Sequence, residues 1–172
     1  MRVRNAEGAE AVGWGETPLS VQWVWPSSLA YGIRHERLKE FCQLLVGEIG
    51  GIEGSGHAFE LGHDFIFGQL SNILTAFNEG QTEAMPWLAA LVCASAFDIA
   101  LHDAFGMANG VPVYESYGPE HLNHDLAAYL EPVGGIADFS GKYPVDFLVS
   151  GRPDHLPAWH LVGGLDLMDE SE

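Results

Sequence analysis

Three polar residues in a strongly apolar stretch could carry out hydrolytic chemistry. Ser95, Asp98 and His102 follow one another at i, i+3 and i+7, which places them on one stripe of a helix. These are the residue types of a nucleophilic triad. However, a nucleophilic serine needs an exposed, strained turn and an oxyanion hole, whereas a mid-helix serine usually bonds back to a carbonyl one turn earlier. We therefore predict structural roles for all three, with Asp98 paired to His102 and with Asp103 capping the helix or bridging to the sheet.

The segment before the second predicted helix offers a phosphate site and a metal site for consideration. The glycines of Gly50-Gly-Ile-Glu-Gly-Ser-Gly-His57 suggest a phosphate loop, but the Lys-Ser/Thr that should follow is missing, as is the preceding strand. His57 and His63 flank Glu60, yet they lie six residues apart, whereas a helical zinc motif needs histidines at i and i+4. We expect a flexible connector here, without a phosphate or metal site.

A loop with two tryptophans holds the remaining candidates for ligand contact. Glu16 follows Gly13-Trp-Gly at the end of a predicted strand, and Thr17 opens the loop that contains Trp23 and Trp25. Strand ends and loops are where functional side chains concentrate. If the loop is extended, Trp23 and Trp25 lie on the same side, because side chains alternate with a period of two. They either cover the edge of the core or form a hydrophobic lid over a ligand.

A hairpin and two amphipathic helices should position these residues. Residues 1–16 alternate as a β-hairpin around a turn at residues 6–10. Apolar residues at helical spacing predict helices over residues 28–49 and 60–77. The buried faces should carry Leu38, Phe41, Cys42, Leu45, Ile49, Ile66, Leu70, Ile73, Leu74 and Phe77. The solvated face of the first helix should carry Arg34, Glu36, Arg37, Lys39 and Glu40.

The central element is a third predicted helix between Met85 and Pro112. It is uncharged from Pro86 to Phe97 and apolar around its whole circumference, which is typical of a buried helix. We expect Gly106 to end it in a left-handed conformation and Asn109-Gly110 with Pro112 to prevent its continuation. Residues 107–157 are rich in Gly, Pro and Asp and suggest a connector, and residues 156–162 are expected to form a strand.

Composition excludes several classes of function. With 24 acidic and 7 basic side chains the formal net charge is −17, which opposes binding to nucleic acids and to anionic membranes. The 47% hydrophobic and 18% charged content is that of a globular protein. The longest uncharged apolar run ends at Asp98, short of the ~20 residues that cross a bilayer, and no basic, apolar leader is present, so we expect a cytoplasmic protein. Cys42 and Cys93 lie in apolar helical patterns and are interpreted as structural.

Three stretches of the chain resemble one known family. They are Ser95-Ala-Phe-Asp-Ile-Ala-Leu-His-Asp-Ala-Phe-Gly106 with Gly110-Val-Pro-Val113, Gly13-Trp-Gly-Glu-Thr17, and Trp159-His-Leu-Val-Gly-Gly-Leu-Asp166. Together they resemble the N-terminal capping domain and the first barrel strand of the enolase superfamily, in its mandelate racemase and muconate lactonizing enzyme branch.

This resemblance implies an α+β fold with two parts. Residues 1–118 would be the capping domain without its first strand, so that an antiparallel hairpin, the remnant of a three-stranded sheet, packs on a helical bundle. Residues 119–172 would be a connector followed by the first strand of a truncated (β/α) barrel, whose closed form needs ~250 residues.

The resemblance also implies a function for the parent enzyme. Such enzymes abstract the proton alpha to a carboxylate with the help of Mg²⁺, as racemases, cycloisomerases or acid-sugar dehydratases. The parent would bind a small carboxylate and form a homo-oligomer. No residue here matches the family's base or Mg²⁺ ligands, so the chain should be inactive by itself, and substrate contacts would fall to Glu16, Thr17, Trp23 and Trp25 in the lid loop.

Two other classes of function compete with this interpretation. The first is a non-catalytic, acidic binding domain that uses Trp23 and Trp25 as anchors, since buried aromatic anchors dominate many interfaces. The second is a hydrolase that uses Ser95 or a histidine-based metal site.

Overall fold

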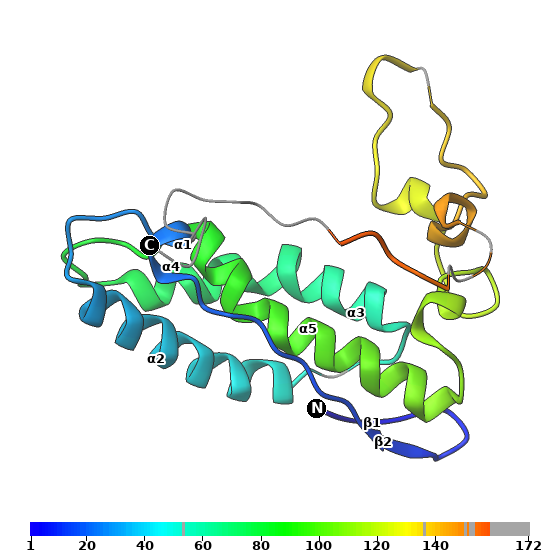
Figure 1. Ribbon diagram of the computed structural model, residues 1–172, viewed down its shortest axis with the longest axis horizontal. Coiled ribbons are helices and arrows are strands. Elements are labelled where there is room, and N and C mark those ends of the chain that lie inside the picture. Colours follow the sequence, from blue (N-terminus) through cyan, green and yellow to red (C-terminus); the bar gives the residue numbers. More distant parts are fainter. Residues whose placement is uncertain (53, 136, 150, 152–153, 159–172) are drawn as a thin grey trace, which may run out of the picture.

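The computed structural model, which describes residues 1–52, 54–135, 137–149, 151 and 154–158, has an α+β fold (Figure 1). This agrees with the predicted fold class. The elements in chain order are β1 (Arg2–Arg4), β2 (Glu10–Val12), α1 (Val21–Val24), α2 (Tyr31–Gly50), α3 (Ala58–Phe65), the π-helical turn η1 (Ile66–Leu70), α4 (Ser71–Asn78), α5 (Trp87–Asn109), and the 3₁₀ turns η2 (Val113–Ser116), η3 (Leu126–Ala128), η4 (Val133–Gly135) and η5 (Pro144–Phe147).

The predicted N-terminal hairpin is present, although its strands are shorter than expected. β1 and β2 pair antiparallel with Val3 opposite Ala11. The side chain of Asn5 closes the turn, because its Oδ1 accepts hydrogen bonds from the backbone N–H groups of Glu7 and Ala9. A two-stranded hairpin is marginal by itself in water, so it depends on the helix on which it packs. That helix is α5, which contacts both strands.

α5 is the central helix, and small side chains let its neighbours approach closely. It contacts α1, α2, α3, α4 and the hairpin. Its buried residues are Ala89, Ala90, Cys93, Ala94, Ala100, Ala104, Gly106 and Ala108. The helix is not buried around its whole circumference, however, because Ile99 and Met107 are 45% and 60% exposed. The apolar composition of α5 predicted its central position in the core, but it did not predict that one side of the helix is exposed to solvent.

The end of α5 differs from the prediction. The helix continues through Gly106 to Asn109, and Gly110 takes the left-handed conformation with φ of 67°. Gly106 has a different reason to be glycine, because a Cβ there would lie 2.9 Å from the carbonyl oxygen of Val111. The chain folds back over Gly106 after the helix ends, and the Val111 N–H donates to the Gly106 carbonyl at 3.0 Å.

α2 packs on α5 through the face that its periodicity predicted, with one correction. Leu38, Phe41 and Leu45 are fully buried. Arg34 was expected on the solvated face, but it is only 6% exposed and donates a hydrogen bond to the carbonyl of Trp25. The physical reason is tertiary: α1 lies over the first turns of α2 and covers a side chain whose position in the helix would otherwise face water.

The second predicted helix is interrupted. α3 and α4 are joined by η1, so the helical path from Ala58 to Asn78 contains a π turn that hydrophobic spacing did not indicate. Leu70 and Leu74 are buried as predicted. Such π turns arise as single insertions in α-helices and are frequent near functional sites.

The segment after α5 is irregular, as its composition predicted. In Figure 1 the yellow loop of residues 130–135 and 137–142 extends away from the helices, whereas Asn123 and His124 bind Glu60 of α3. Leu122 and Leu126 are nevertheless buried, and the Leu126 N–H donates to the carbonyl of Lys142 at 2.8 Å. The predicted strand at 156–162 lies mostly outside the described residues, and residues 156–158 are not in a strand. The division at residue 118 stays a prediction.

One helix of the described chain is long and apolar enough to cross a membrane. This helix is α5, with a mean hydropathy of 1.6, and 33% of its most apolar window is buried. The uncharged run does end at Asp98, but the helix continues past Asp98 and Asp103 to Asn109, and this gives it the length and composition of a spanning helix. The core helix of a soluble protein meets the same criteria, and α5 packs on α2, α3 and the hairpin.

Candidate functional site

The lid candidates do not gather at one place. Glu16 is exposed, Thr17 is half-buried, and Trp23 is 67% exposed. Trp25 is only 3% exposed, and its Nε1–H donates to Oε1 of Glu83 at 3.0 Å. The expectation that both tryptophans lie on one side is wrong, because Val21–Val24 form the helical turn α1 instead of an extended segment. Trp25 therefore covers the core, and Trp23 alone is available to a ligand.

Two glycines hold the start of this loop against α5. A Cβ on Gly13 would lie 2.2 Å from the Ala100 carbonyl oxygen and 2.2 Å from the Ala104 nitrogen. A Cβ on Gly15 would lie 2.1 Å from the Ala96 carbonyl oxygen. The chain after β2 thus lies directly on the backbone of α5, where alanines recur at every fourth residue, and only glycine fits at both positions.

A carboxylate on α5 fixes the same segment. Oδ2 of Asp103 accepts a hydrogen bond from the backbone N–H of Trp14, between the two glycines, at 2.9 Å. This is the bridge to the sheet that the sequence suggested for Asp103. Together, the glycine contacts and this hydrogen bond set the direction in which Glu16 and Thr17 leave the helix surface.

The end of the loop is anchored on α2 and on the segment before α5. The buried Arg34 guanidinium binds the Trp25 carbonyl, while Glu83 binds the Trp25 indole N–H. Val21 and Val24 of α1 are buried as well. The loop from Glu16 to Trp25 is therefore fixed at both ends, and Trp23 projects from a rigid turn instead of a free strand.

The possible triad on α5 has structural roles, as predicted. The Ser95 hydroxyl donates to the carbonyl of Val92 at 2.7 Å, so its proton is engaged within the helix. The Nδ1–H of His102 donates to the Asp98 carbonyl at 2.9 Å and lies 3.7 Å from Oδ1 of Asp98. No proton path joins Ser95 to His102 through these contacts, which does not support a hydrolase.

A polar network that the sequence interpretation missed lies at the start of α3. His57 is 1% exposed and caps the helix, because its Nδ1 accepts the Phe59 N–H at 3.0 Å. The proton of the neutral ring is therefore on Nε2, which donates to Oγ of Ser116 at 2.9 Å. The Ser116 hydroxyl in turn donates to the Val113 carbonyl at 2.6 Å. This chain of hydrogen bonds ties α3 to η2.

Glu60 extends the network to the next turn of the chain. Its side chain is 8% exposed, and Oε2 accepts from the His57 N–H at 3.1 Å, which completes a capping box. The Asn123 side-chain amide donates to Oε2 at 2.7 Å, and the Asn123 N–H donates to Oε1 at 2.8 Å. The His124 N–H and ring Nδ1–H donate to Oε1 at 3.0 and 3.2 Å. A single buried carboxylate thus fastens the loop at residues 123–124.

The electrostatics of the network fix one protonation state for each group. Burial is the main cause that lowers the pKa of His57 to about 4, and the nearby His102 lowers it further, so the ring is neutral. Burial alone would raise the pKa of Glu60, but the hydrogen bonds from His57 and Asn123 outweigh it and hold the pKa below its usual value. A neutral histidine whose two nitrogens are both engaged is a structural latch, since neither nitrogen is open to a substrate.

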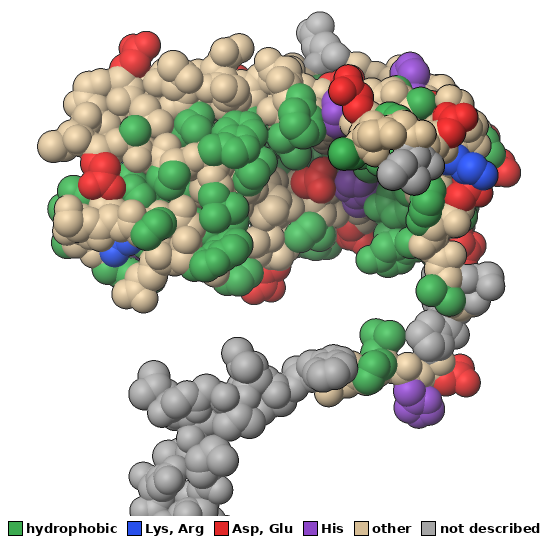
Figure 2. Space-filling model, turned by 90° about the horizontal axis from the view of Figure 1, so that it is seen from above, with side chains coloured by type: hydrophobic (Ala, Val, Ile, Leu, Met, Phe, Trp, Pro, Cys, Tyr) green, Lys and Arg blue, Asp and Glu red, His purple; other side chains and the backbone are tan. Residues whose placement is uncertain are grey.

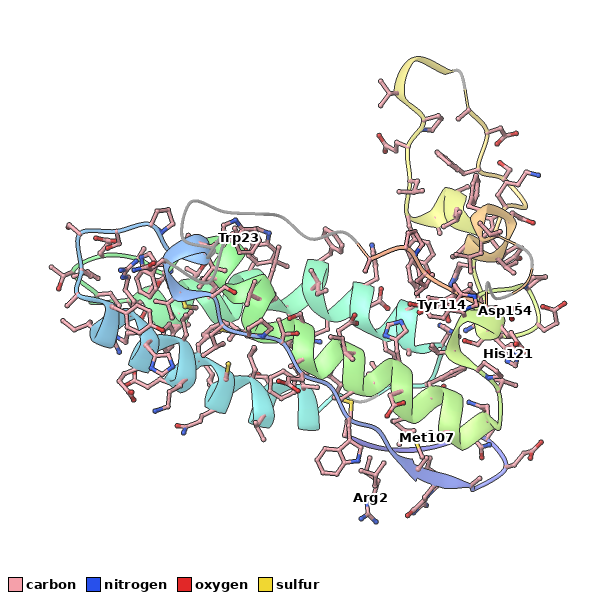
Figure 3. All side chains as sticks on the ribbon, in the orientation of Figure 1. Arg2, Trp23, Met107, Tyr114, His121 and Asp154 are labelled. Atoms are coloured by element: carbon pink, nitrogen blue, oxygen red, sulfur yellow. The ribbon has the colours of Figure 1, made fainter. Side chains whose placement is uncertain are left out.

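The network and the lid lie at opposite ends of the molecule. Figure 3 shows Trp23, a residue of α1, toward one end of the molecule. Tyr114 and His121 lie toward the other end, near the C-terminal end of α5. Figure 2 shows histidine and acidic side chains toward this second end, next to a field of apolar side chains over the helices. The two regions therefore cannot act on one small substrate.

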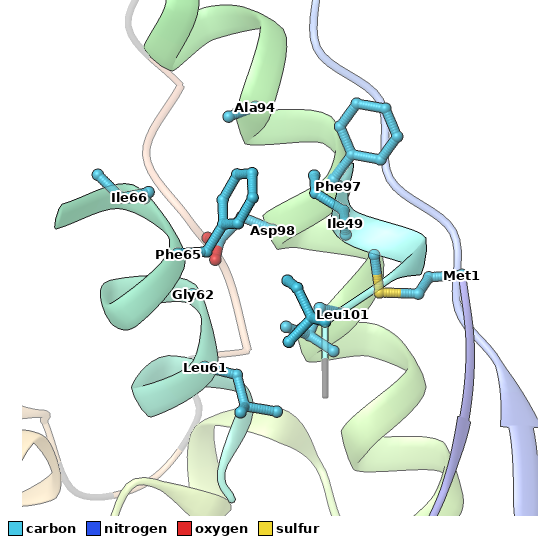
Figure 4. A pocket seen from close by; sticks show the side chains of 11 residues that line it. Met1, Ile49, Leu61, Gly62, Phe65, Ile66, Ala94, Phe97, Asp98 and Leu101 are labelled. Carbon is cyan, nitrogen blue, oxygen red and sulfur yellow. The ribbon is translucent and has the colours of Figure 1, made fainter. Parts of the chain in front are cut away.

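The best-defined cavity is too small for a carboxylate substrate. It has a volume of about 20 Å³ and lies between α3, α5 and the end of α2, with the Asp98 carboxylate at its wall (Figure 4). Its other walls are apolar, and a volume of this size holds about one water molecule. A wider hollow of about 370 Å³ lies over Gly106 and the chain from Gly110 to Val113, where Asp103 is its carboxylate.

A metal site is not formed by the described residues. Among them no group of three or more His, Cys, Asp or Glu side chains is arranged to hold a metal ion. The Mg²⁺ that the family resemblance implies does not fit this part of the chain. Its ligands would have to come from outside the described residues.

Comparisons with known proteins return no relative. Protein-family models, curated proteins and solved structures each give no match to this chain. The resemblance to the enolase superfamily therefore depends on the quoted stretches of sequence and on how they pack.

Proposed function

We propose that this chain is the capping part of an enolase-superfamily enzyme, which abstracts the proton alpha to a carboxylate. The reaction would be a racemisation, a cycloisomerisation or the dehydration of an acid sugar. The base and the Mg²⁺ ligands would be supplied by a barrel outside the described residues, so the described part alone would be inactive. A cytoplasmic location and a homo-oligomeric parent belong to this proposal.

One observation carries the proposal: two of the stretches that resemble the family pack on each other. Gly13 and Gly15 of the first stretch contact the backbone of Ala96, Ala100 and Ala104 in the second. One close contact between the segment after β2 and α5 therefore constrains both stretches, which gives a physical reason for their joint occurrence. This supports a shared fold, and the activity follows by analogy with the family.

In this proposal the loop from Glu16 to Trp25 serves as the lid over the substrate. The exposed Glu16 and Trp23 would contact the substrate or exclude water from it, while Trp25, Arg34 and Glu83 would hold the lid in place. A rigid, apolar side chain at the rim of a site excludes water, and this strengthens the electrostatic interactions inside.

The test is proton exchange in the longest in-frame product that contains this chain. The product is incubated in D₂O with Mg²⁺ and a panel of 2-hydroxy carboxylates and acid sugars, and deuterium at the alpha carbon is measured by NMR. We expect exchange that chelation of Mg²⁺ abolishes. Glu16→Gln and Trp23→Ala should raise KM, whereas Glu7→Gln, in the hairpin turn, should not. Absence of exchange across the panel would reject the proposal.

The exposure of Trp23 also favours a second candidate, an acidic binding domain. Trp23 is 67% exposed, and the formal net charge is −17, which suits a cationic partner. Trp25 cannot act as a second anchor in this conformation, because it is buried. Binding of a basic peptide to the wild type that is lost in Trp23→Ala and retained in Trp14→Ala would support this candidate.

A further inference from the structure

Cys42 of α2 and Cys93 of α5 both lie at the interface between these two helices. Sγ of Cys93 lies 3.6 Å from the carbonyl oxygen of Leu38, to which it donates a hydrogen bond. Cys42 follows Leu38 by four residues, which is one helical turn. Because side chains of an α-helix lean back toward its N-terminus, the Cys42 thiol lies over the Leu38 turn and beside Cys93. Each thiol is the first cause of the shift in the other's pKa, which agrees with this placement.

The two thiols differ in accessibility and in acidity. Cys42 is half-buried, whereas Cys93 is 1% exposed. The neighbouring Cys93 lowers the pKa of the Cys42 thiol. The neighbouring Cys42 and burial both raise the pKa of the Cys93 thiol. A thiolate is the nucleophile in disulfide exchange, so Cys42 is the thiol that reacts first.

We propose that Cys42 and Cys93 are a modification site that forms a reversible disulfide between α2 and α5 when the protein meets a low-molecular-weight disulfide. Cys42 is the attacking thiol and Cys93 is the resolving thiol. This inference goes beyond the proposed function, because it requires neither the lid nor a barrel.

The reaction balances in two exchange steps. The Cys42 thiolate attacks one sulfur of the small disulfide, forms a mixed disulfide, and releases one small thiolate. The Cys93 thiol then gives its proton to the released thiolate and attacks Sγ of Cys42, which expels the second small thiolate. That thiolate takes up the proton that Cys42 lost at the start. The two cysteines are oxidised, and the small disulfide is reduced to two thiols.

The cross-link should stabilise the fold. It would join α2 to α5. It would also close a loop of roughly 50 residues, which removes conformational freedom from the unfolded chain. We expect the oxidised protein to melt about 10 °C above the reduced protein.

The test uses the full chain, reduced and then incubated with oxidised glutathione at about pH 8, where thiolates are available. Intact mass under non-reducing conditions should show a monomer that has lost two hydrogens, and peptide mapping should join the Cys42 and Cys93 peptides. The melting temperature should rise and should return to its original value after reduction.

Matched variants separate the two roles. Cys93→Ser should accumulate the mixed disulfide with glutathione on Cys42, and Cys42→Ser should remain unmodified because Cys93 is buried. The proposal is overturned if the wild type accumulates the mixed disulfide as Cys93→Ser does, if only intermolecular disulfides form, or if Cys42→Ser reacts as fast as the wild type. The wild-type peptide map decides the question even if a variant does not fold.

Discussion

Replacing Gly13 by alanine tests the contact on which the fold and the lid depend. The new Cβ would lie 2.2 Å from the Ala100 carbonyl oxygen and from the Ala104 nitrogen, whereas ordinary contacts begin at 3.4 Å. Both neighbours are backbone atoms in the middle of α5, so no side chain can rotate away. The segment after β2 would have to move outward by roughly 1 Å, since overpacked sites relax by shifting backbone.

The cost of this movement can be estimated from its parts. Overpacking costs about 1–3 kcal/mol. Displacement of this segment also weakens the hydrogen bond from the Trp14 N–H to Asp103. Such a bond contributes about 1 kcal/mol to the free energy of unfolding. We therefore expect Gly13→Ala to lower the free energy of unfolding by about 3 kcal/mol, which corresponds to a fall in melting temperature of roughly 10 °C.

Gly47 in α2 provides the matched control. A Cβ there meets nothing within 4 Å, and the position is inside an exposed part of a helix. Gly47→Ala should raise the free energy of unfolding by about 0.5–1 kcal/mol, because alanine loses less backbone entropy than glycine. Chemical denaturation of both variants gives the two values. If Gly13→Ala is as stable as Gly47→Ala, the segment after β2 does not lie on α5, and the start of the lid loop is not fixed there.

Further predictions concern the two tryptophans and the polar network. Trp25→Ala should lower the free energy of unfolding by about 3–5 kcal/mol, because it empties a buried site, while Trp23→Ala should change it by less than about 0.5 kcal/mol; equal effects in thermal melts would contradict the assignment. Glu60→Gln should cost about 2 kcal/mol and speed hydrogen exchange at residues 123–124, since a neutral amide side chain cannot accept all of these bonds; unchanged exchange there would argue against the latch. The pKa of His57 is about 4 in the folded protein, below the usual 6.5. The free energy of unfolding should therefore be unaffected by this group above pH 6.5 and should fall by no more than about 3 kcal/mol as the pH falls toward 4. In His57→Asn, which retains a helix cap, denaturation curves over that range should show a smaller decline, and an equal decline would mean that another group titrates.

The sequence predicted those elements that depend on local pattern. The hairpin, the helices of residues 31–50 and 87–109, and the buried face with Leu38, Phe41 and Leu45 follow from periodicity and turn residues. The sequence left two roles open for Asp103, a helix cap or a bridge to the sheet, and the structure shows a hydrogen bond to Trp14, just after β2.

The errors arose where tertiary contacts decide the outcome. Arg34 has the helical position of a surface residue, but α1 covers it. Trp23 and Trp25 lie on one side only if the loop is extended, whereas four residues of it form a helical turn. The sequence predicts that Gly106 ends the helix, but α5 continues to Asn109. The missing side chain of Gly106 instead allows the chain at Val111 to pack directly on α5.

The Glu60 network could have been found in the sequence. His57 and Glu60 stand at N-cap and N3 spacing before an apolar helix, which is the pattern of a capping box with an unusual cap residue. The phosphate-loop and zinc-motif patterns of the segment do not indicate this cap. The partners at Ser116 and Asn123 are about 60 residues away, so no local pattern could have indicated them.

The central claim is that this chain caps a barrel that carries the base and the metal ligands. Sequencing the DNA on both sides of the reading frame tests it most directly. If the claim holds, the frame continues upstream into a strand and downstream into a Lys-x-Lys motif with spaced Asp and Glu codons on successive strands. Verified start and stop signals that bound these 172 codons would contradict it and would leave a binding role for the exposed Trp23.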